Sequence, residues 1–211
     1  PIGVGLGVWL IAGSVTEMLT RILPRRFNFG IAMSRAIGLP RSAWGTAFAH
    51  AGLGVTMIGI AATAWGVEHI SVTKAGENIA IGPYVVSLDS SFKRTGQGYR
   101  EDGARFLITR DNQALGAIET SKRVHAAREM PTTEAGIVTF GFGQLYASLN
   151  EILPDGRVSV HLYWKPFVTL IWGGALVMAF GGALSLSDRR IRLVAAERLS
   201  SAAKKARGVP A

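Results

Sequence analysis

One ionisable side chain lies inside an apolar run of the sequence that is long enough to cross a membrane. His50 stands within residues 44–67, which contain no charged residue and no proline. As a helix, residues 45–67 would measure roughly 33 Å, close to the ~30 Å hydrocarbon thickness of a bilayer. Because an ionisable group is costly there, His50 is the first candidate for function.

Three chemical roles are open to this imidazole. It can hydrogen-bond a neighbouring helix, ligate a metal or haem iron, or carry a proton. A neutral imidazole binds iron without placing a charge in lipid, which favours the ligand role. Small residues near His50 would let a porphyrin or a second helix approach the backbone. Helical spacing gives His50 the following neighbours on its face: Thr46, Ala47, Leu53, Gly54, Met57 and Ile58.

The remaining histidines show no metal-ligand spacing, and we expect ordinary surface or interface positions for His69, His125 and His161. The chain has no cysteine, so it offers no thiolate nucleophile, thiolate ligand or redox pair. It also shows no phosphate-binding loop, dinucleotide fingerprint or Ser-His-Asp set. Any chemistry must therefore run through His50 or through residues of a partner.

Three apolar runs and one mixed segment surround these residues. We expect transmembrane helices at 1–19, 45–67 and 167–187, and an arginine-rich loop at 20–44. A first helix without a signal-peptide layout suggests that the sequence starts inside a membrane segment of a longer protein. Glu17 and Arg21 are spaced to pair on that helix, and Ser42 is placed to cap the second one.

Residues 68–166 alternate short β-branched and aromatic runs with turn clusters, which predicts an antiparallel β-sandwich or small barrel. Turns are expected at 111–112 and 154–156. The predicted strands are residues 70–74, 78–81, 84–89, 104–110, 114–119, 144–149 and 158–165.

The net charge of +9 is unevenly distributed. Residues 20–44 carry only basic charges, and the tail at 188–211 is strongly basic, whereas residues 68–166 hold eleven basic and eleven acidic side chains. Cytoplasmic segments of membrane proteins carry the excess of Lys and Arg. The distribution therefore predicts cytoplasmic placement of 20–44 and 188–211, external placement of 68–166, contact with membrane lipid, and no nucleic-acid partner.

Seven short motifs, in order, resemble the C-terminal part of the CcmF/NrfE family, the membrane haem lyases of bacterial cytochrome c maturation. Each motif is weak by itself, but the ordered set covers nearly the whole chain. The motifs are RSAWG at 41–45, AHAG at 49–52, SKR at 121–123, MPTTEAGI at 130–137, LYASL at 145–149, YWKPF at 163–167 and DRR at 188–190.

The resemblance implies that His50 is an axial ligand of a haem b in the bacterial inner membrane and that 68–166 is periplasmic. It also implies the activity, attachment of haem to the Cys-x-x-Cys-His segment of apocytochrome c. The implied partners are a periplasmic haem chaperone, thiol-presenting subunits and the upstream part of the same protein. That upstream part would hold the family's Trp-rich segment and its periplasmic histidine pair.

Two points remain open on the sequence. Gly143-Gln144 replaces the Arg-Asp that this family usually has before Leu-Tyr, which leaves the role of that pair unassigned. About 25 Å of helix would separate His50 from the external domain, so we expect the second iron ligand to come from a helix outside this chain. The alternative function is a membrane-anchored scaffold or sensor without chemistry, in which His50 only bonds a neighbouring helix.

Overall fold

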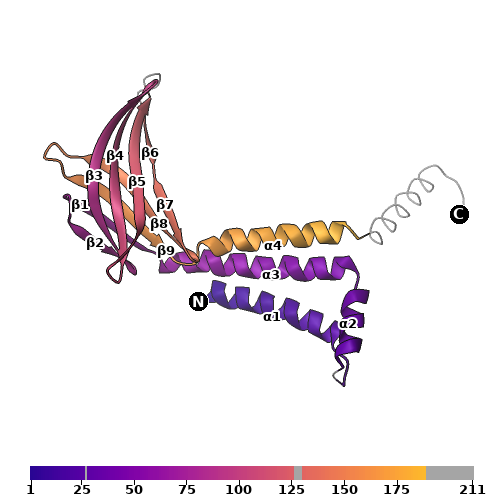
Figure 1. The fold of residues 1–211 in the computed structure, drawn as a ribbon. Helices are drawn as coiled ribbons and strands as arrows, with labels where there is room; N and C mark the ends of the chain where they lie inside the picture. The colour runs from indigo at the N-terminus through magenta and orange to yellow at the C-terminus, as the bar shows by residue number, and fades with distance from the viewer. Residues whose placement is uncertain (27, 126–129, 189–211) are drawn as a thin grey trace, which may run out of the picture. The chain divides into compact units, whose positions relative to one another are not determined.

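The computed structural model describes residues 1–26, 28–125 and 130–188 (Figure 1). These form two compact units, one helical (1–61 with 170–188) and one built of strands (62–169). Most of the predicted basic tail, residues 189–211, lies outside the described residues. This architecture confirms the predicted class, a helical membrane protein with an inserted antiparallel β-sandwich.

The helical unit contains α1 (Ile2–Ile22), α2 (Phe29–Gly38), α3 (Arg41–Ala62) and α4 (Thr169–Leu186). Among the described residues, three helices are long and apolar enough to cross a membrane: α1, α4, and α3 with its short 3-10 extension to Trp65. The predicted Glu17–Arg21 pair forms at 2.6 Å on α1. The second apolar helix ends earlier than predicted, because Gly66 adopts an extended conformation and strand β1 follows at Val67.

Two expectations for residues 20–44 are wrong. The segment is not all loop, since α2 begins after Asn28, whose side chain accepts a hydrogen bond from the Ile31 N–H at 3.2 Å. Ser42 does not cap the next helix, because α3 already begins at Arg41. Instead the Ser42 N–H donates to the carboxylate of Asp188 at 3.0 Å. The cap thus comes from a residue 146 positions away, which local sequence does not reveal.

Glycines let α3 pack closely on both of its neighbours. Gly45, Gly52 and Gly59 recur every seven residues and lie against α4, where a Cβ on Gly52 would stand 2.7 Å from the Gly174 carbonyl oxygen. Gly54 packs in the same way against Gly7 of α1. Such close approach gives membrane helices their van der Waals contact. The two contacts also decide which side of α3 stays open.

The β unit consists of two antiparallel sheets. The four-stranded sheet has the order β1-β9-β8-β7, and the five-stranded sheet has the order β2-β3-β4-β5-β6. Their bounds are β1 Val67–Thr73, β2 Asn78–Ile81, β3 Tyr84–Gly96, β4 Tyr99–Arg110, β5 Gln113–His125, β6 Pro131–Glu134, β7 Gly136–Phe140, β8 Gly143–Ile152 and β9 Val158–Lys165.

The predicted strands are confirmed, but β6 and β7 were missed and β3, β4 and β5 are longer than expected. The MPTTEAGI motif contains all of β6 and the first two residues of β7, and the chain passes from one sheet to the other between Glu134 and Gly136. Gly136 is needed at this crossing, since a Cβ would lie 2.3 Å from the Glu119 carbonyl oxygen. The predicted turn at Asp111-Asn112 is confirmed, with both residues at positive φ.

One apolar core fills the space between the sheets. Its largest fully buried side chains include Phe106, Ile108, Leu145 and Leu149. They occupy alternate positions of β4 and β8, as a half-buried sheet requires. Toward the β3–β4 hairpin the apolar core ends at Ala104. Between Ala104 and the hairpin, the ends of β3, β4 and β5 carry charged side chains.

Candidate functional site

His50 lies on a side of α3 that neither neighbouring helix covers. Gly52 faces α4 and Gly54 faces α1, whereas His50 is exposed and Leu53 is 41% exposed. Helical spacing placed Gly54 and Ile58 beside His50, but both pack against Gly7 of α1 instead. The open side therefore carries the imidazole among apolar side chains.

The tautomer of His50 follows from its hydrogen bond. The ring Nδ1 lies 2.9 Å from the backbone carbonyl oxygen of Thr46, one turn earlier. A carbonyl only accepts, so Nδ1 carries a proton and donates it, and in the neutral ring Nε2 is then the nitrogen with the lone pair. Histidines that ligate metals commonly donate their second ring N–H to a carbonyl in this way. The residues present thus fit a haem group, with Nε2 as the atom that would meet the iron.

The three other histidines all belong to the β unit. His69 and His125 are exposed on β1 and β5. The Nδ1 of His161 lies 2.6 Å from the hydroxyl of Tyr163, and its Nε2 lies 3.7 Å from a carboxylate oxygen of Glu68. Among the described residues, no group of three or more His, Cys, Asp or Glu side chains could hold a metal ion.

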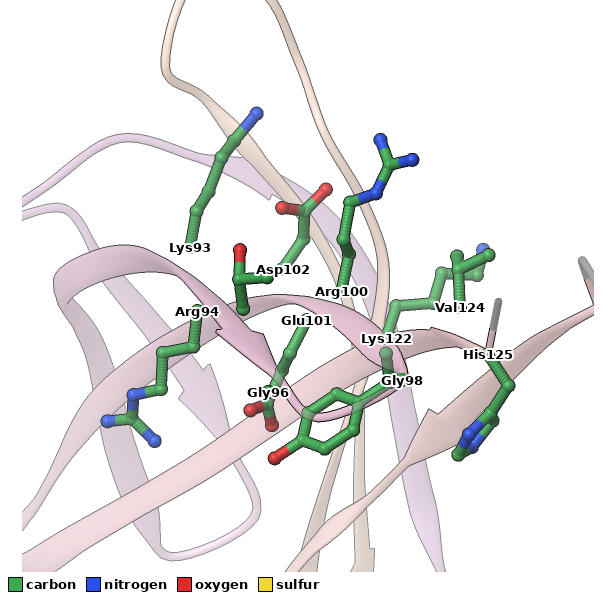
Figure 2. Close-up of a pocket in the computed structure, with 12 residues that line it drawn as sticks. Lys93, Arg94, Gly96, Gly98, Arg100, Glu101, Asp102, Lys122, Val124 and His125 are labelled. Atoms are coloured by element: carbon green, nitrogen blue, oxygen red, sulfur yellow. The ribbon is translucent and has the colours of Figure 1, made fainter. Parts of the chain in front are cut away.

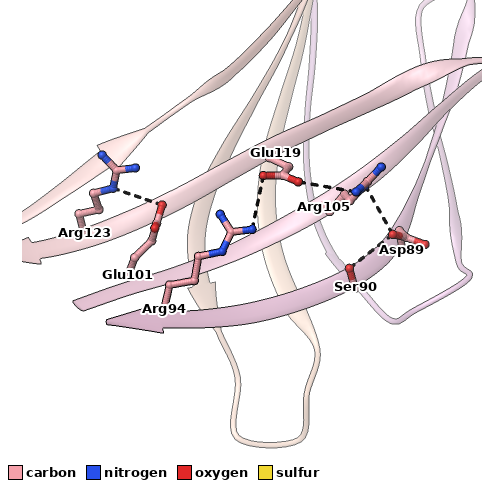
Figure 3. A network of polar contacts seen from close by, with 7 residues as sticks. All are labelled: Asp89, Ser90, Arg94, Glu101, Arg105, Glu119 and Arg123. Carbon is pink, nitrogen blue, oxygen red and sulfur yellow. Dashed lines mark hydrogen bonds and ion pairs between the residues drawn. The ribbon is translucent and has the colours of Figure 1, made fainter. Parts of the chain in front are cut away.

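A buried ion pair at the end of the five-stranded sheet was not expected from the sequence. The Arg123 Nε lies 3.2 Å from a carboxylate oxygen of Glu101, whose side chain is only 6% exposed. The same guanidinium also pairs with Glu134. Arg123 belongs to the SKR motif and Glu134 to MPTTEAGI, so the ion pairs join the two motifs. Figure 3 shows the Arg123–Glu101 contact beside a second network of Arg94, Glu119, Arg105, Asp89 and Ser90.

The surroundings of Glu101 favour its ionised form. A hydrogen bond from the Ser121 side chain and the charge of Arg123 hold the pKa of Glu101 below its usual value of 4.5, against the opposing effect of burial. Because the folded-state pKa is lowered, the carboxylate stabilises the fold above about pH 4.5. That contribution is lost as the pH falls through the folded-state pKa.

The Glu101→Gln variant tests this linkage. We expect the variant to be less stable than wild type at neutral pH and to lose less stability between about pH 5 and pH 3. The measurement is the free energy of unfolding against pH, by circular dichroism of the detergent-solubilised chain. Glu151→Gln, at an exposed carboxylate on β8, is the control and should follow the wild-type curve. Parallel curves for wild type and Glu101→Gln would contradict the assignment.

A cavity of about 780 Å³ adjoins this ion pair at the β3–β4 hairpin (Figure 2). In the figure, Lys93, Arg100 and Asp102 rise from one side of the strands, and Arg94, Glu101 and His125 lie on the other. The Lys122 Nζ is already engaged, since it donates to the Asn150 carbonyl oxygen at 2.8 Å. The cavity lining has more basic side chains (Lys93, Arg94, Arg100 and Lys122) than acidic ones (Glu101 and Asp102), so its net charge is positive.

Comparison with known proteins decides the family. The family model described as the CcmF C-terminal beta-sandwich matches residues 64–166. Over 203 residues the chain is 46% identical to the cytochrome c-type biogenesis protein CycK of Rhizobium meliloti (strain 1021), covering 96% of this chain and 30% of the relative. The chain belongs to the CcmF family.

Other members agree with this assignment. The chain is 34% identical over 192 residues to the cytochrome c-type biogenesis protein CcmF of Escherichia coli (strain K12), covering 90% of this chain and 28% of that CcmF. A solved structure named cytochrome c heme lyase CcmF shares the fold, with a TM-score of 0.68 at 13% identity over 89% of this chain and 31% of that one. The chain spans about 30% of the length of the curated relatives it matches.

Gly143 and Gln144 both have defined contacts in the four-stranded sheet. The ring of Trp164, from the YWKPF motif, lies so close to Gly143 that a Cβ there would stand within 2.2 Å of it. Gln144 accepts a hydrogen bond from the Tyr146 hydroxyl at 2.6 Å and donates to the Thr139 hydroxyl. In this CcmF chain the pair serves packing of the four-stranded sheet.

Proposed function

We propose that the chain is the part of a cytochrome c haem lyase that supplies His50 as an axial ligand of haem b. The observation that carries the proposal is the free Nε2 of His50 on an uncovered, apolar side of α3. Membership of a family whose curated relatives are named for cytochrome c-type biogenesis supports it. The proposed location is the bacterial inner membrane, with 68–166 in the periplasm and 188–211 in the cytoplasm.

Residues of this chain would prepare the ligand. The Thr46 carbonyl accepts the Nδ1 proton and orients the ring, so that Nε2 is the nitrogen of the neutral imidazole that would bind the iron. Exposed apolar side chains such as Leu53 would exclude water from the iron. A haem b bound there supplies reversible one-electron chemistry.

This chain has no cysteine and supplies no sulfur nucleophile itself. In the proposed reaction, two thiols of the Cys-x-x-Cys-His segment of apocytochrome c form thioether bonds with the haem vinyl groups. The proposed partners are a periplasmic haem chaperone, apocytochrome c with its thiol-presenting subunits, and the upstream part of the same protein. The fragment by itself is expected to be inactive.

The second iron ligand is proposed to lie outside this chain. His69, His125 and His161 belong to the β unit, whereas His50 belongs to the helical unit. We therefore expect the isolated chain, loaded with haem in detergent, to lack the six-coordinate bis-imidazole optical spectrum that the full-length protein should show. A bis-imidazole spectrum from the isolated chain would contradict this proposal.

The alternative is a membrane-anchored scaffold or sensor, in which His50 does no more than bond within its own helix. A pyridine haemochrome assay on the purified full-length protein separates the two functions. Haem b in the preparation supports the lyase. A colourless preparation that still binds its partners supports the scaffold.

A further inference from the structure

Among the described residues, part of one edge of the five-stranded sheet has no neighbouring strand. β2 pairs with β3 only from Tyr84 to Ser87, whereas β3 continues to Gly96. In the described parts of the chain, residues 90–96 of β3 therefore pair on one side only, with β4. Such an edge is a template for an additional strand.

The hairpin geometry identifies the free backbone groups. Gly96 and Tyr99 close the β3–β4 hairpin around a two-residue turn, and the closing pair of such a hairpin exchanges its hydrogen bonds. Because bonded and non-bonded pairs alternate, the N–H and C=O groups of Ser91, Lys93 and Thr95 point away from β4.

A contact on the other side of the β-bulge between Leu88 and Ser90 agrees with this alternation of inward and outward backbone groups. The Leu88 carbonyl points to the same edge and accepts a hydrogen bond from the Gly76 N–H at 2.9 Å. The edge is thus used by the chain itself at Leu88 and becomes free beyond the bulge.

The two charged side chains of this edge, Lys93 and Arg94, are both basic. Lys93 stands opposite Asp102 and Thr95 opposite Arg100, on one face of the sheet and at the rim of the cavity (Figure 2). Within the described residues, neither Lys93 nor Arg100 has an ion pair within 4.0 Å.

On the opposite face, the Arg94 side chain is 57% exposed, lies 3.9 Å from a carboxylate oxygen of Glu119 and stacks over the ring of Phe92. Glu101, the other carboxylate at the cavity, pairs with Arg123, which it shares with Glu134. The positive charge of the edge that no ion pair balances therefore lies on the face of Lys93 and Arg100.

We propose that residues 90–96 of β3 receive an extended, acidic segment of a partner protein as an additional strand of the sheet. The partner's backbone would pair with Ser91, Lys93 and Thr95, and its carboxylates would meet Lys93 and Arg100. The competing explanation is that exposed Lys and Arg merely protect an edge strand from association. The proposal does not depend on haem binding at His50.

The test uses the full chain in detergent and a fluorescent peptide of alternating valine and glutamate as the probe. We expect saturable binding by fluorescence anisotropy at low ionic strength, and none with a valine–lysine peptide. Ser91→Pro removes an outward N–H at an edge position where proline is tolerated, and it should abolish binding. Lys93→Glu with Arg100→Glu keeps the backbone and should weaken binding roughly tenfold.

Two controls define the site. Arg110→Glu with Arg157→Glu makes the same charge change at the other end of β4 and before β9, and it should leave binding unchanged. Hydrogen exchange should show that the peptide protects the amides of Ser91, Lys93 and Thr95. Absence of peptide binding, binding that Ser91→Pro leaves intact, self-association through this edge, or capture of phosphatidylglycerol vesicles in place of the peptide would each overturn the proposal.

Discussion

Replacing His50 by alanine in the full-length protein is expected to remove most of its haem b. Loss of a supporting hydrogen-bond partner commonly lowers metal affinity 10–100-fold, so loss of the ligand itself should cost about a hundredfold or more. The measurement is the Soret absorbance per protein, with haem quantified as the pyridine haemochrome. Thr46 offers its backbone carbonyl to His50, so side-chain changes at Thr46 should leave the haem in place.

A matched histidine provides the control for this experiment. His69→Ala removes an exposed imidazole from β1 and should keep the full haem content. His50→Gly with added imidazole separates ligation from packing, because free imidazole restores the Soret band only if it binds the iron. Full Soret absorbance in His50→Ala would overturn the assignment of this residue.

Replacing Gly52 by leucine is expected to destabilise the helical unit strongly. A Cβ at this position would lie 2.7 Å from both the Gly174 carbonyl oxygen and the Met178 backbone nitrogen, and backbone atoms of a packed helix cannot move aside cheaply. Overpacking of a tight core typically costs 1–3 kcal/mol, and we expect about 2 kcal/mol or more here. The measurement is thermal unfolding of the chain in detergent.

Gly173→Leu is the control for the contact between α3 and α4. Gly173 lies on α4 next to Gly174, but nothing lies within 4 Å of the position that a Cβ on Gly173 would take. We expect Gly173→Leu to be neutral or slightly stabilising, because glycine is a poor helix former. Equal destabilisation by the two variants would show that the effect comes from helix propensity and not from the glycine contacts.

Features with a local cause could be predicted from the sequence. The apolar runs specify three long helices, because length and hydropathy are properties of consecutive residues. The pairing of Glu17 with Arg21 and the Asp111-Asn112 turn also follow from neighbours in the chain. His50 could be singled out for the same reason, as an ionisable residue within one apolar run.

Features that depend on distant residues could not be predicted in this way. Glu101 is buried only because Arg123 and Ser121 of the adjacent strand satisfy its charge, and β6 exists only because β5 offers it an edge.

The side of α3 that carries His50 is open because α1 and α4 pack against two other sides of α3, where its glycines allow close contact. The sequence by itself determined the membrane helices, the β character of residues 68–166 and the histidine. Tertiary packing decided which surfaces are free, because exposure is set by neighbours that the chain brings together from more than a hundred positions away.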